Sequence, residues 1–273
     1  MLAFVVRVAP DEVDLASDRL WQLGVRGVEE RPVDEEWVEL WSAVGEDSAA
    51  IERAASVIGD DWAWRTEEVA DAHPETWRDH ARPRPIGGRL LVVPAWQADA
   101  EVDTAGDRIP ILVEPGAAFG FGDHPTTELT LQALEREVRP SGTVLDVGCG
   151  TGILAIAAVK LGAGRVRAFD LATAAVEATT DNARRNGVEG RVEVDTTAAT
   201  DLEGRYDLVL ANILAPTLVA LAPDLRRLTA PGGQLVISGI LADAHDHVLD
   251  ALAPMHVDRT DTLAGWAAVT LSI

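Results

Sequence analysis

Three glycines alternate in the segment "DVGCGTG", at Gly148, Gly150 and Gly152, directly after an apolar stretch that predicts a β-strand. A glycine turn at the carboxyl end of a strand lets the backbone come close to a ligand. The spacing differs from the G-x-G-x-x-G of dinucleotide sites, because Ile153 stands at the third glycine position. We therefore interpret the turn as a small-molecule site that does not hold NAD. The alternative is a tight strand-to-helix turn without a ligand.

An acidic residue, Asp146, precedes this turn and indicates the charge of the ligand. A carboxylate there would repel a pyrophosphate and favour a ligand with a cationic head. S-adenosylmethionine, with its ammonium and sulfonium groups, has that character. We therefore predict that Asp146, Gly148 and Gly150 bind this cofactor.

Two further acids follow the next two predicted strands. Asp170 lies 22 residues after Gly148, where an acid accepts hydrogen bonds from both ribose hydroxyls in nucleoside-binding α/β folds. The alternative role for Asp170 is to cap the helix that follows. Asp195 and Thr196 come after the third strand, where an adenine edge would rest, and we predict Asp195 as a cofactor contact.

A polar residue, Asn212, ends the apolar strand in "YDLVLANILAP" at the same carboxyl edge. Its side chain offers a carbonyl oxygen and an amide to whatever meets the methyl group, and we predict it as the catalytic residue. The alternative is an N-cap for the helix over 215–228, and the two roles are compatible.

A second glycine-rich segment, "EPGAAFGFGDHPTTELTLQALE" over 114–135, leads into a helix. Such a segment could fold over a ligand as a lid, although its composition predicts only a loop-to-helix junction. His124 is a candidate proton acceptor by position, with a structural role as the alternative. Cys149 has no histidine near it in the sequence and is not predicted to be a nucleophile.

Regular alternation of strands and helices from Ser141 onward predicts a mostly parallel sheet with helices on both faces. The predicted strands lie near 143–147, 165–169, 190–194, 206–211, 233–238, 255–260 and 266–272. The predicted helices lie near 126–138, 152–162, 172–187, 215–228 and 241–252. The segments 88–96 and 108–116 are expected to be additional strands of this domain.

The first part of the chain has a different pattern. Strands over 2–8, 25–32, 36–44 and 61–69 alternate with helices over 11–24 and 48–59, which predicts the β-α-β-β-α-β order of ferredoxin-like domains. Five of the eight tryptophans lie here, and most are expected in its core. We therefore predict three parts: a ferredoxin-like domain over 1–69, a linker over 70–85 and a second domain over 86–273.

Charge is the unusual feature of the composition. The chain of 273 residues carries 23 basic and 45 acidic side chains, a net charge of −22, and residues 1–67 account for −10 of it. Such a field repels nucleic-acid backbones and attracts basic partners, although it can also serve solubility alone. No apolar run is long enough to span a membrane, no signal peptide is indicated, and the single cysteine favours the cytoplasm.

Five segments together resemble the ribosomal protein L-eleven methyltransferase family (PrmA). They are "EPGAAFGFGDHPTT", "LDVGCGTGILAIAA", "NARRNGV", "LANILAPTL" and "PGGQLVISGIL". The resemblance extends over residues 77–273, and the N-terminal unit is similar to the family's substrate-recognition domain in pattern. One departure is Phe121, where the family usually has threonine, which puts the lid or the amine entrance in doubt.

The resemblance implies a class I methyltransferase fold, Rossmann-like, with a mostly parallel seven-stranded sheet. It implies transfer of methyl groups from S-adenosylmethionine to lysine side chains and the N-terminal amine of one basic ribosomal protein. The family's cofactor contacts correspond here to Thr127, Gly148, Asp170 and Asn212. We expect no bound metal, no direct nucleic-acid binding, no membrane association and a monomer.

Two other functions stay open at this point. The same chemistry could act on another protein, because a related branch modifies lysines of an electron-transfer flavoprotein subunit. The chain could also be a cofactor-binding module without catalysis, a possibility that Phe121 raises. Turnover of labelled cofactor with a purified ribosomal subunit separates the enzyme hypotheses from the binding module.

Overall fold

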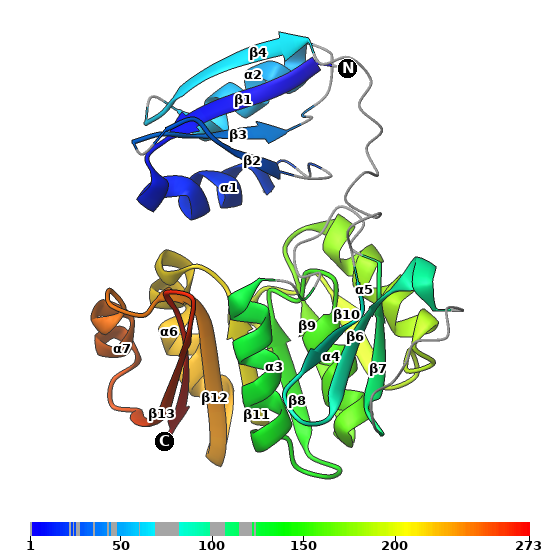
Figure 1. Cartoon of the computed structure of the whole chain (residues 1–273). Helices are drawn as coiled ribbons and strands as arrows, with labels where there is room; N and C mark the ends of the chain where they lie inside the picture. The colour runs from blue at the N-terminus through cyan, green and yellow to red at the C-terminus, as the bar shows by residue number, and fades with distance from the viewer. Residues whose placement is uncertain are drawn as a thin grey trace. The chain divides into compact units, whose positions relative to one another are not determined.

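The protein is described by a computed structural model that covers most of the chain. The residues it describes are 2–21, 23, 25, 28–34, 36–42, 44, 48–59, 61–68, 82–98, 107–114, 122 and 124–273. They divide into two compact units, one made by the described residues up to 68 and one from Arg82 onward (Figure 1). Most of the predicted linker and Phe121 lie outside the described residues.

The first unit is a four-stranded antiparallel sheet with two helices. Its elements are β1 (Leu2–Val8), α1 (Val13–Trp21), β2 (Val28–Pro32), β3 (Val38–Ser42), α2 (Ser48–Ile58) and β4 (Ala63–Glu68). The strand order β2-β3-β1-β4 confirms the predicted ferredoxin-like arrangement. Alternate residues of β1 pack with both helices in one apolar core, so the helices cover the same face of the sheet.

The other face of this small sheet carries stacked arginine and tryptophan side chains. The guanidinium of Arg31 lies 3.9 Å from the ring centroid of Trp41, and that of Arg65 lies 5.5 Å from the same ring. Arg65 also binds Glu39 through both carboxylate oxygens. The expectation that most tryptophans are core residues is therefore wrong for this unit, because of the described tryptophan side chains only Trp62 is buried.

The second unit is built on a seven-stranded sheet in the order β10-β9-β8-β11-β12-β14-β13. Its strands are β8 (Thr143–Val147), β9 (Arg165–Phe169), β10 (Val192–Asp195), β11 (Tyr206–Asn212), β12 (Thr229–Leu241), β13 (His256–Leu263) and β14 (Trp266–Ser272). The first five run parallel, and β14 is antiparallel to both of its neighbours. The predicted fold class is thus confirmed.

Helices cover both faces of this sheet (Figure 1). They are α3 (Pro125–Glu137), α4 (Ile153–Leu161), α5 (Thr173–Arg185), α6 (Ala215–Leu228) and α7 (Asp246–Leu252). One apolar cluster contains residues of α3, α4 and α5, and the other contains residues of α6 and α7, so the two groups lie on opposite faces. The helix α7 starts later than predicted, because β12 continues to Leu241 by pairing with Trp266 of β14.

A separate three-stranded sheet lies beside the first helix group. It consists of β5 (Arg84–Ile86), β6 (Leu90–Pro94) and β7 (Ile109–Val113) in that order. Its apolar side chains belong to the same cluster as α3 and α4. The strand β5 pairs with β6 and begins at Arg84, within the range predicted as linker. The last strand, β7, leads toward the glycine-rich segment before α3.

Candidate active site

The parallel strands bring the predicted site residues to one edge of the sheet. Each strand from β8 to β11 runs in the same direction, so all their carboxyl ends meet there. The strand order reverses between β8 and β11, which is the place where open α/β sheets bind ligands. The predicted residues that follow or end these strands are Gly148 and Gly150 after β8, Asp170 after β9, Asp195 in β10 and Asn212 in β11.

The glycine turn needs its glycines for two reasons. Gly148, Gly150 and Gly152 have φ values of 70°, 53° and 78°, a region that residues with a side chain rarely adopt. There is also no space: a Cβ on Gly148 would lie 2.6 Å from Cγ2 of Ile213, and one on Gly152 would lie 2.7 Å from Cγ2 of Thr179. The turn therefore passes close to the end of β11 and to α5.

Asp146 is fully buried beneath this turn. Its Oδ2 accepts a hydrogen bond of 3.1 Å from the Ala155 amide of α4. Its Oδ1 is buried and has no hydrogen-bond partner among the residues that the structure describes. Burial raises the pKa of this carboxyl to about 7; the Ala155 bond opposes the rise, and the nearby charge of Asp170 adds to it. An oxygen in that position suits a donor or a cationic group.

Asp170 connects the end of β9 to the glycine turn. Its Oδ2 accepts from the Gly150 amide at 3.1 Å, and its Oδ1 accepts from the Ala172 amide at 2.9 Å. Ala172 itself is the N-cap residue of α5, so Asp170 supports the start of the helix from two residues away. Each carboxylate oxygen keeps a further lone pair that can accept from a ribose hydroxyl.

Both carboxylate oxygens of Asp195 bind other residues, one of them an arginine. Its Oδ1 accepts from the Thr197 amide at 2.9 Å, and its Oδ2 forms an ion pair with Arg167. Burial tends to raise the pKa of Asp195, but the Thr197 hydrogen bonds and the Arg167 charge outweigh it and lower the pKa. Thr196 is exposed beside it. The adenine contact therefore stays a prediction for a residue that also anchors the end of β10.

Asn212 ends β11 beside Ser238 of β12, and its side chain is half-buried. The next helix, α6, has Leu214 as its N-cap residue and no side-chain cap. The alternative role of Asn212 as that N-cap is therefore wrong. In the described part of the chain its amide group has no hydrogen-bond partner, which leaves it available for a ligand.

The start of α3 supplies a second buried group with an unused lone pair. The Oγ1 of Thr127 is buried and has no hydrogen-bond partner within the described ranges. It lies in the first turn of α3, where the helix dipole favours a negative charge, although the amides of Thr126 and Thr127 are already bonded to His124. A buried hydroxyl without a partner in the described part of the chain and the positive end of a helix dipole thus occur together at Thr127.

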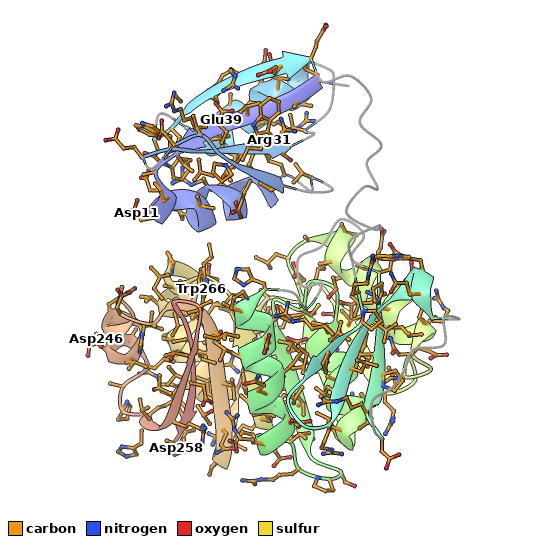
Figure 2. All side chains as sticks on the ribbon, viewed as in Figure 1. Asp11, Arg31, Glu39, Asp246, Asp258 and Trp266 are labelled. Carbon is orange, nitrogen blue, oxygen red and sulfur yellow. The ribbon has the colours of Figure 1, made fainter. Side chains whose placement is uncertain are left out.

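His124 is the N-cap residue of α3. Its Nδ1 accepts from the Thr126 amide at 3.4 Å and lies 2.8 Å from the Thr126 Oγ1. Its ring meets the ring of Trp266 edge-on, with centroids 5.1 Å apart. Trp266, which is labelled in Figure 2, is the first residue of β14. These contacts favour the structural role over the proton acceptor, because one ring nitrogen is already used.

Cys149 lies inside the glycine turn and is buried. Its Sγ is 3.3 Å from the Thr179 hydroxyl, and burial raises the pKa of the thiol well above its ordinary value. A protonated, buried thiol is not a nucleophile. Within the described residues no cluster of side chains could hold a metal ion, and no helix is long and apolar enough to span a membrane.

Two residues of α5 belong to the site, although the sequence reasoning did not select them. Thr179 and Asn182 are fully buried polar residues that bond the carbonyls of Gly150 and Thr151. A sequence signal existed, since the segment "NARRNGV" starts at Asn182. The sequence alone did not indicate what this segment does, because the backbone groups that Thr179 and Asn182 bind lie 29 or more residues away in the chain.

Comparison with known proteins covers nearly the whole chain. The family described as "Ribosomal protein L11 methyltransferase (PrmA)" matches residues 32–272. A protein named ribosomal protein L11 methyltransferase from Pseudomonas aeruginosa (strain LESB58) is 39% identical over 285 residues, with 96% of this chain and 95% of that protein covered. The chain belongs to the ribosomal protein L11 methyltransferase family. A relative of the same name from Pelotomaculum thermopropionicum is 37% identical, with 98% and 97% covered.

A solved structure supports the family fold. The ribosomal protein L11 methylase from Lactobacillus delbrueckii subsp. bulgaricus is similar with a TM-score of 0.64 and 36% identity, over 70% of this chain and 98% of that one. The resemblance seen in the motifs is thus confirmed, and it extends beyond residue 77 toward the N-terminus. The seven-stranded unit is a class I methyltransferase domain.

The cofactor of this family is S-adenosylmethionine, as predicted. The residues of this edge fit it by their chemistry. Asp146 Oδ1 and Thr127 Oγ1 are buried atoms without partners in the described part of the protein, and the glycine turn has a backbone bare of side chains at its three glycines, at the carboxyl end of β8. Asp146 would face a cationic group, the Thr127 hydroxyl would donate to a carboxylate, and Asp170 would hold the ribose hydroxyls.

Proposed function

We propose that this enzyme methylates lysine side chains and the N-terminal amine of ribosomal protein L11. One observation supports this most strongly: relatives named for L11 match the chain over both of its units, including the N-terminal one. A shared methyltransferase domain alone would leave the substrate open. A shared N-terminal unit indicates a shared partner.

The reaction that we propose is a single displacement. The amine nitrogen forms a bond to the methyl carbon as the carbon–sulfur bond breaks, and the electron pair of that bond stays on sulfur. Because the cofactor supplies a good leaving group, the protein's main task is to align the two reactants. The amine must arrive neutral, although a free lysine with a pKa of about 10.4 is mostly protonated at neutral pH.

We propose that Asn212 aligns the amine. It ends β11, next to the glycine turn that follows β8, and Ile213 after it contacts that turn closely. The oxygen of its amide can accept a hydrogen bond from the amine and so direct the nitrogen lone pair. Because His124 uses Nδ1 as the N-cap of α3, we expect the proton to leave to water.

The N-terminal unit is proposed to bind the protein substrate. It carries much of the acidic excess, including Asp11, which is exposed at the turn before α1 (Figure 2). A basic ribosomal protein is attracted to such a field. We also propose that the enzyme works as a monomer in the cytoplasm and does not bind nucleic acid itself, since −22 charges repel phosphates.

The test is transfer of labelled methyl groups to purified L11, followed by mass spectrometry of the product. We expect label on lysines and on the N-terminal residue, and much less label with the Asp170→Ala variant at limiting cofactor. Label on an electron-transfer flavoprotein subunit but not on L11 would assign the chain to the alternative substrate. Cofactor binding without any transfer would make it a binding module.

A further inference from the structure

Three polar side chains lie in a row along α5 and its C-cap residue. They are Thr179, Asn182 and Asn186, and their spacing of three and four residues places them on one face of the helix. Thr179 and Asn182 are completely buried, and Asn186 is half-buried. Buried polar side chains cost stability unless they are hydrogen-bonded, so their partners indicate what they are for.

Asn182 bonds two backbone segments that are distant in the sequence. Its Oδ1 accepts from the Glu114 amide at 3.0 Å, and its Nδ2 donates to the Glu114 carbonyl at 2.9 Å. The same Nδ2 donates to the Thr151 carbonyl at 3.0 Å. Glu114 follows β7, and Thr151 belongs to the glycine turn. One amide group therefore joins the small sheet to the cofactor turn.

Thr179 holds the neighbouring peptide of the same turn. Its Oγ1 donates to the Gly150 carbonyl at 3.0 Å. A peptide unit is planar, so the direction of its carbonyl fixes the direction of the amide that follows. Thr179 and Asn182 thus set the orientation of two successive peptide planes in the turn. Without these hydrogen bonds, the peptide units next to Gly150 and Gly152 could rotate more easily, because glycine restricts the backbone little.

A further described residue, Gly122, lies beside the start of α4. A Cβ on Gly122 would lie 3.2 Å from Cδ1 of Ile153, the first residue of α4 after the turn. Two residues later His124 caps α3, which carries Thr127. The glycine turn is therefore bonded through Asn182 to Glu114, and the first residue of α4 after it lies beside Gly122.

We propose that Asn182 is a positioning residue for the cofactor, acting through the Thr151 carbonyl and Glu114. It holds the glycine turn in register with Glu114 at the end of β7. Thr179 assists it through the Gly150 carbonyl. The proposal rests on the family's cofactor and not on the identity of the methylated protein, so it can fail or succeed independently of the L11 assignment.

The chain contains a matched control for this role. Asn186 accepts from the Leu112 amide at 3.0 Å and donates to the carbonyls of Leu112 and Asn182 at 2.7 and 2.8 Å. It therefore makes the same kinds of hydrogen bond to β7 as Asn182 makes to Glu114, but it has no bond to the turn. A purely structural role would give Asn182→Ala and Asn186→Ala the same effects.

Calorimetric binding of S-adenosylmethionine to the full-length variants tests the proposal, with urea unfolding of the unliganded proteins alongside. We expect at least tenfold weaker binding for Asn182→Ala and a change within twofold for Asn186→Ala, with both unfolding midpoints lowered. Equal binding losses in the two variants, or unchanged binding in Asn182→Ala, would overturn the proposal.

A second pair covers the case in which Asn182→Ala does not fold. Thr179→Val removes the bond to the Gly150 carbonyl, whereas Thr180→Val removes a bond of 2.8 Å to Val176 within α5. We expect at least threefold weaker binding for Thr179→Val only, and recovery in Thr179→Ser, which keeps the hydroxyl. Wild-type binding by Thr179→Val, or equal losses in the two valine variants, would overturn the proposal.

Discussion

Asp146 shows how one buried carboxyl couples stability to cofactor binding. Its pKa of about 7 in the folded protein exceeds the ordinary value of 3.8. In the unliganded protein, protonated Asp146 therefore contributes fully to the free energy of unfolding below pH 3.8. This contribution is lost as the pH rises to about 7, because over that range the carboxyl is ionised in the unfolded chain but still protonated in the folded protein. The loss is on the order of 4 kcal/mol at most, from about 1.36 kcal/mol per pKa unit.

Asp146→Asn should remove this dependence. The asparagine can still accept from the Ala155 amide and stays neutral, so the unliganded variant should be more stable than the wild type at pH 7.5 and similar at pH 4. Its affinity for S-adenosylmethionine should be weaker and should not rise between pH 5.5 and 7.5, as that of the wild type should. Urea unfolding and calorimetry measure both. Parallel pH profiles of the two proteins would contradict the prediction.

Asp170 is the residue at which ribose recognition can be tested. Asp170→Ala should weaken S-adenosylmethionine binding by roughly 1.5–3 kcal/mol, as for hydrogen bonds to a charged group. Asp170→Asn keeps one acceptor oxygen and should lose less. Calorimetry with both variants decides the matter, and unchanged affinity in the alanine variant would refute the ribose contact.

Asn212 allows catalysis and structure to be separated. Asn212→Ala should lower kcat more than it weakens cofactor binding, because its proposed partner is the amine. Removal of an N-cap side chain usually lowers the free energy of unfolding by about 1 kcal/mol. Because Leu214 and not Asn212 is the N-cap of α6, we expect no such loss for Asn212→Ala. Equal losses in kcat and in cofactor affinity would make Asn212 mainly a cofactor contact.

At the scale of elements, the turn between β8 and α4 is constrained by both backbone conformation and contacts. Gly148→Ala forces a side chain into a positive φ and places its Cβ 2.6 Å from Cγ2 of Ile213. Gly187→Ala imposes a similar φ of 65° with no atom within 4 Å. We expect both variants to lose roughly 1 kcal/mol or more from backbone strain.

Only Gly148→Ala should also weaken S-adenosylmethionine binding. Its added Cβ must push the glycine turn and Ile213 apart, whereas the Cβ at position 187 meets no atom. Thermal unfolding with and without cofactor compares the two variants. If the cofactor stabilises Gly148→Ala as much as Gly187→Ala, the turn does not form the cofactor surface.

For the whole molecule, the two compact units predict separable functions. A truncated chain of residues 70–273 should fold and bind S-adenosylmethionine, because the seven-stranded unit has its own apolar clusters. It should lose most methylation of intact L11, since docking supplies the proximity that makes transfer fast. Raising the salt should reduce the advantage of the full chain, because exposed charges more than about 10 Å apart are screened at 0.1 M.

Initial rates on intact L11 at two salt concentrations measure this effect, with calorimetry as the control for an intact cofactor site. Equal rates for the truncated and full chains would show that the N-terminal unit does not recognise the substrate. The arginine and tryptophan stacks on its open sheet face, with Arg31 and Glu39 labelled in Figure 2, make local charge there more balanced than the composition predicts.

The sequence by itself determined the features that are local in the chain. The order of strands and helices follows from short periodic segments, and the glycine turn with Asp146 and Asp170 lies within 25 residues. Family motifs are local in the same way, so the class of enzyme and its cofactor could be predicted. Element ends were less certain, as at Leu241, where pairing with β14 extends β12.

Only the tertiary structure decided what depends on distant neighbours. Asn182 meets Glu114 across 68 residues, and no local pattern marks such a pair. The raised pKa of Asp146 comes from complete burial, which periodicity does not measure. Asp195 pairs with Arg167 because β10 lies beside β9, and Asn212 is excluded as an N-cap because α6 begins after Leu214. In each case the deciding energy comes from desolvation or hydrogen bonding between segments that only folding brings together.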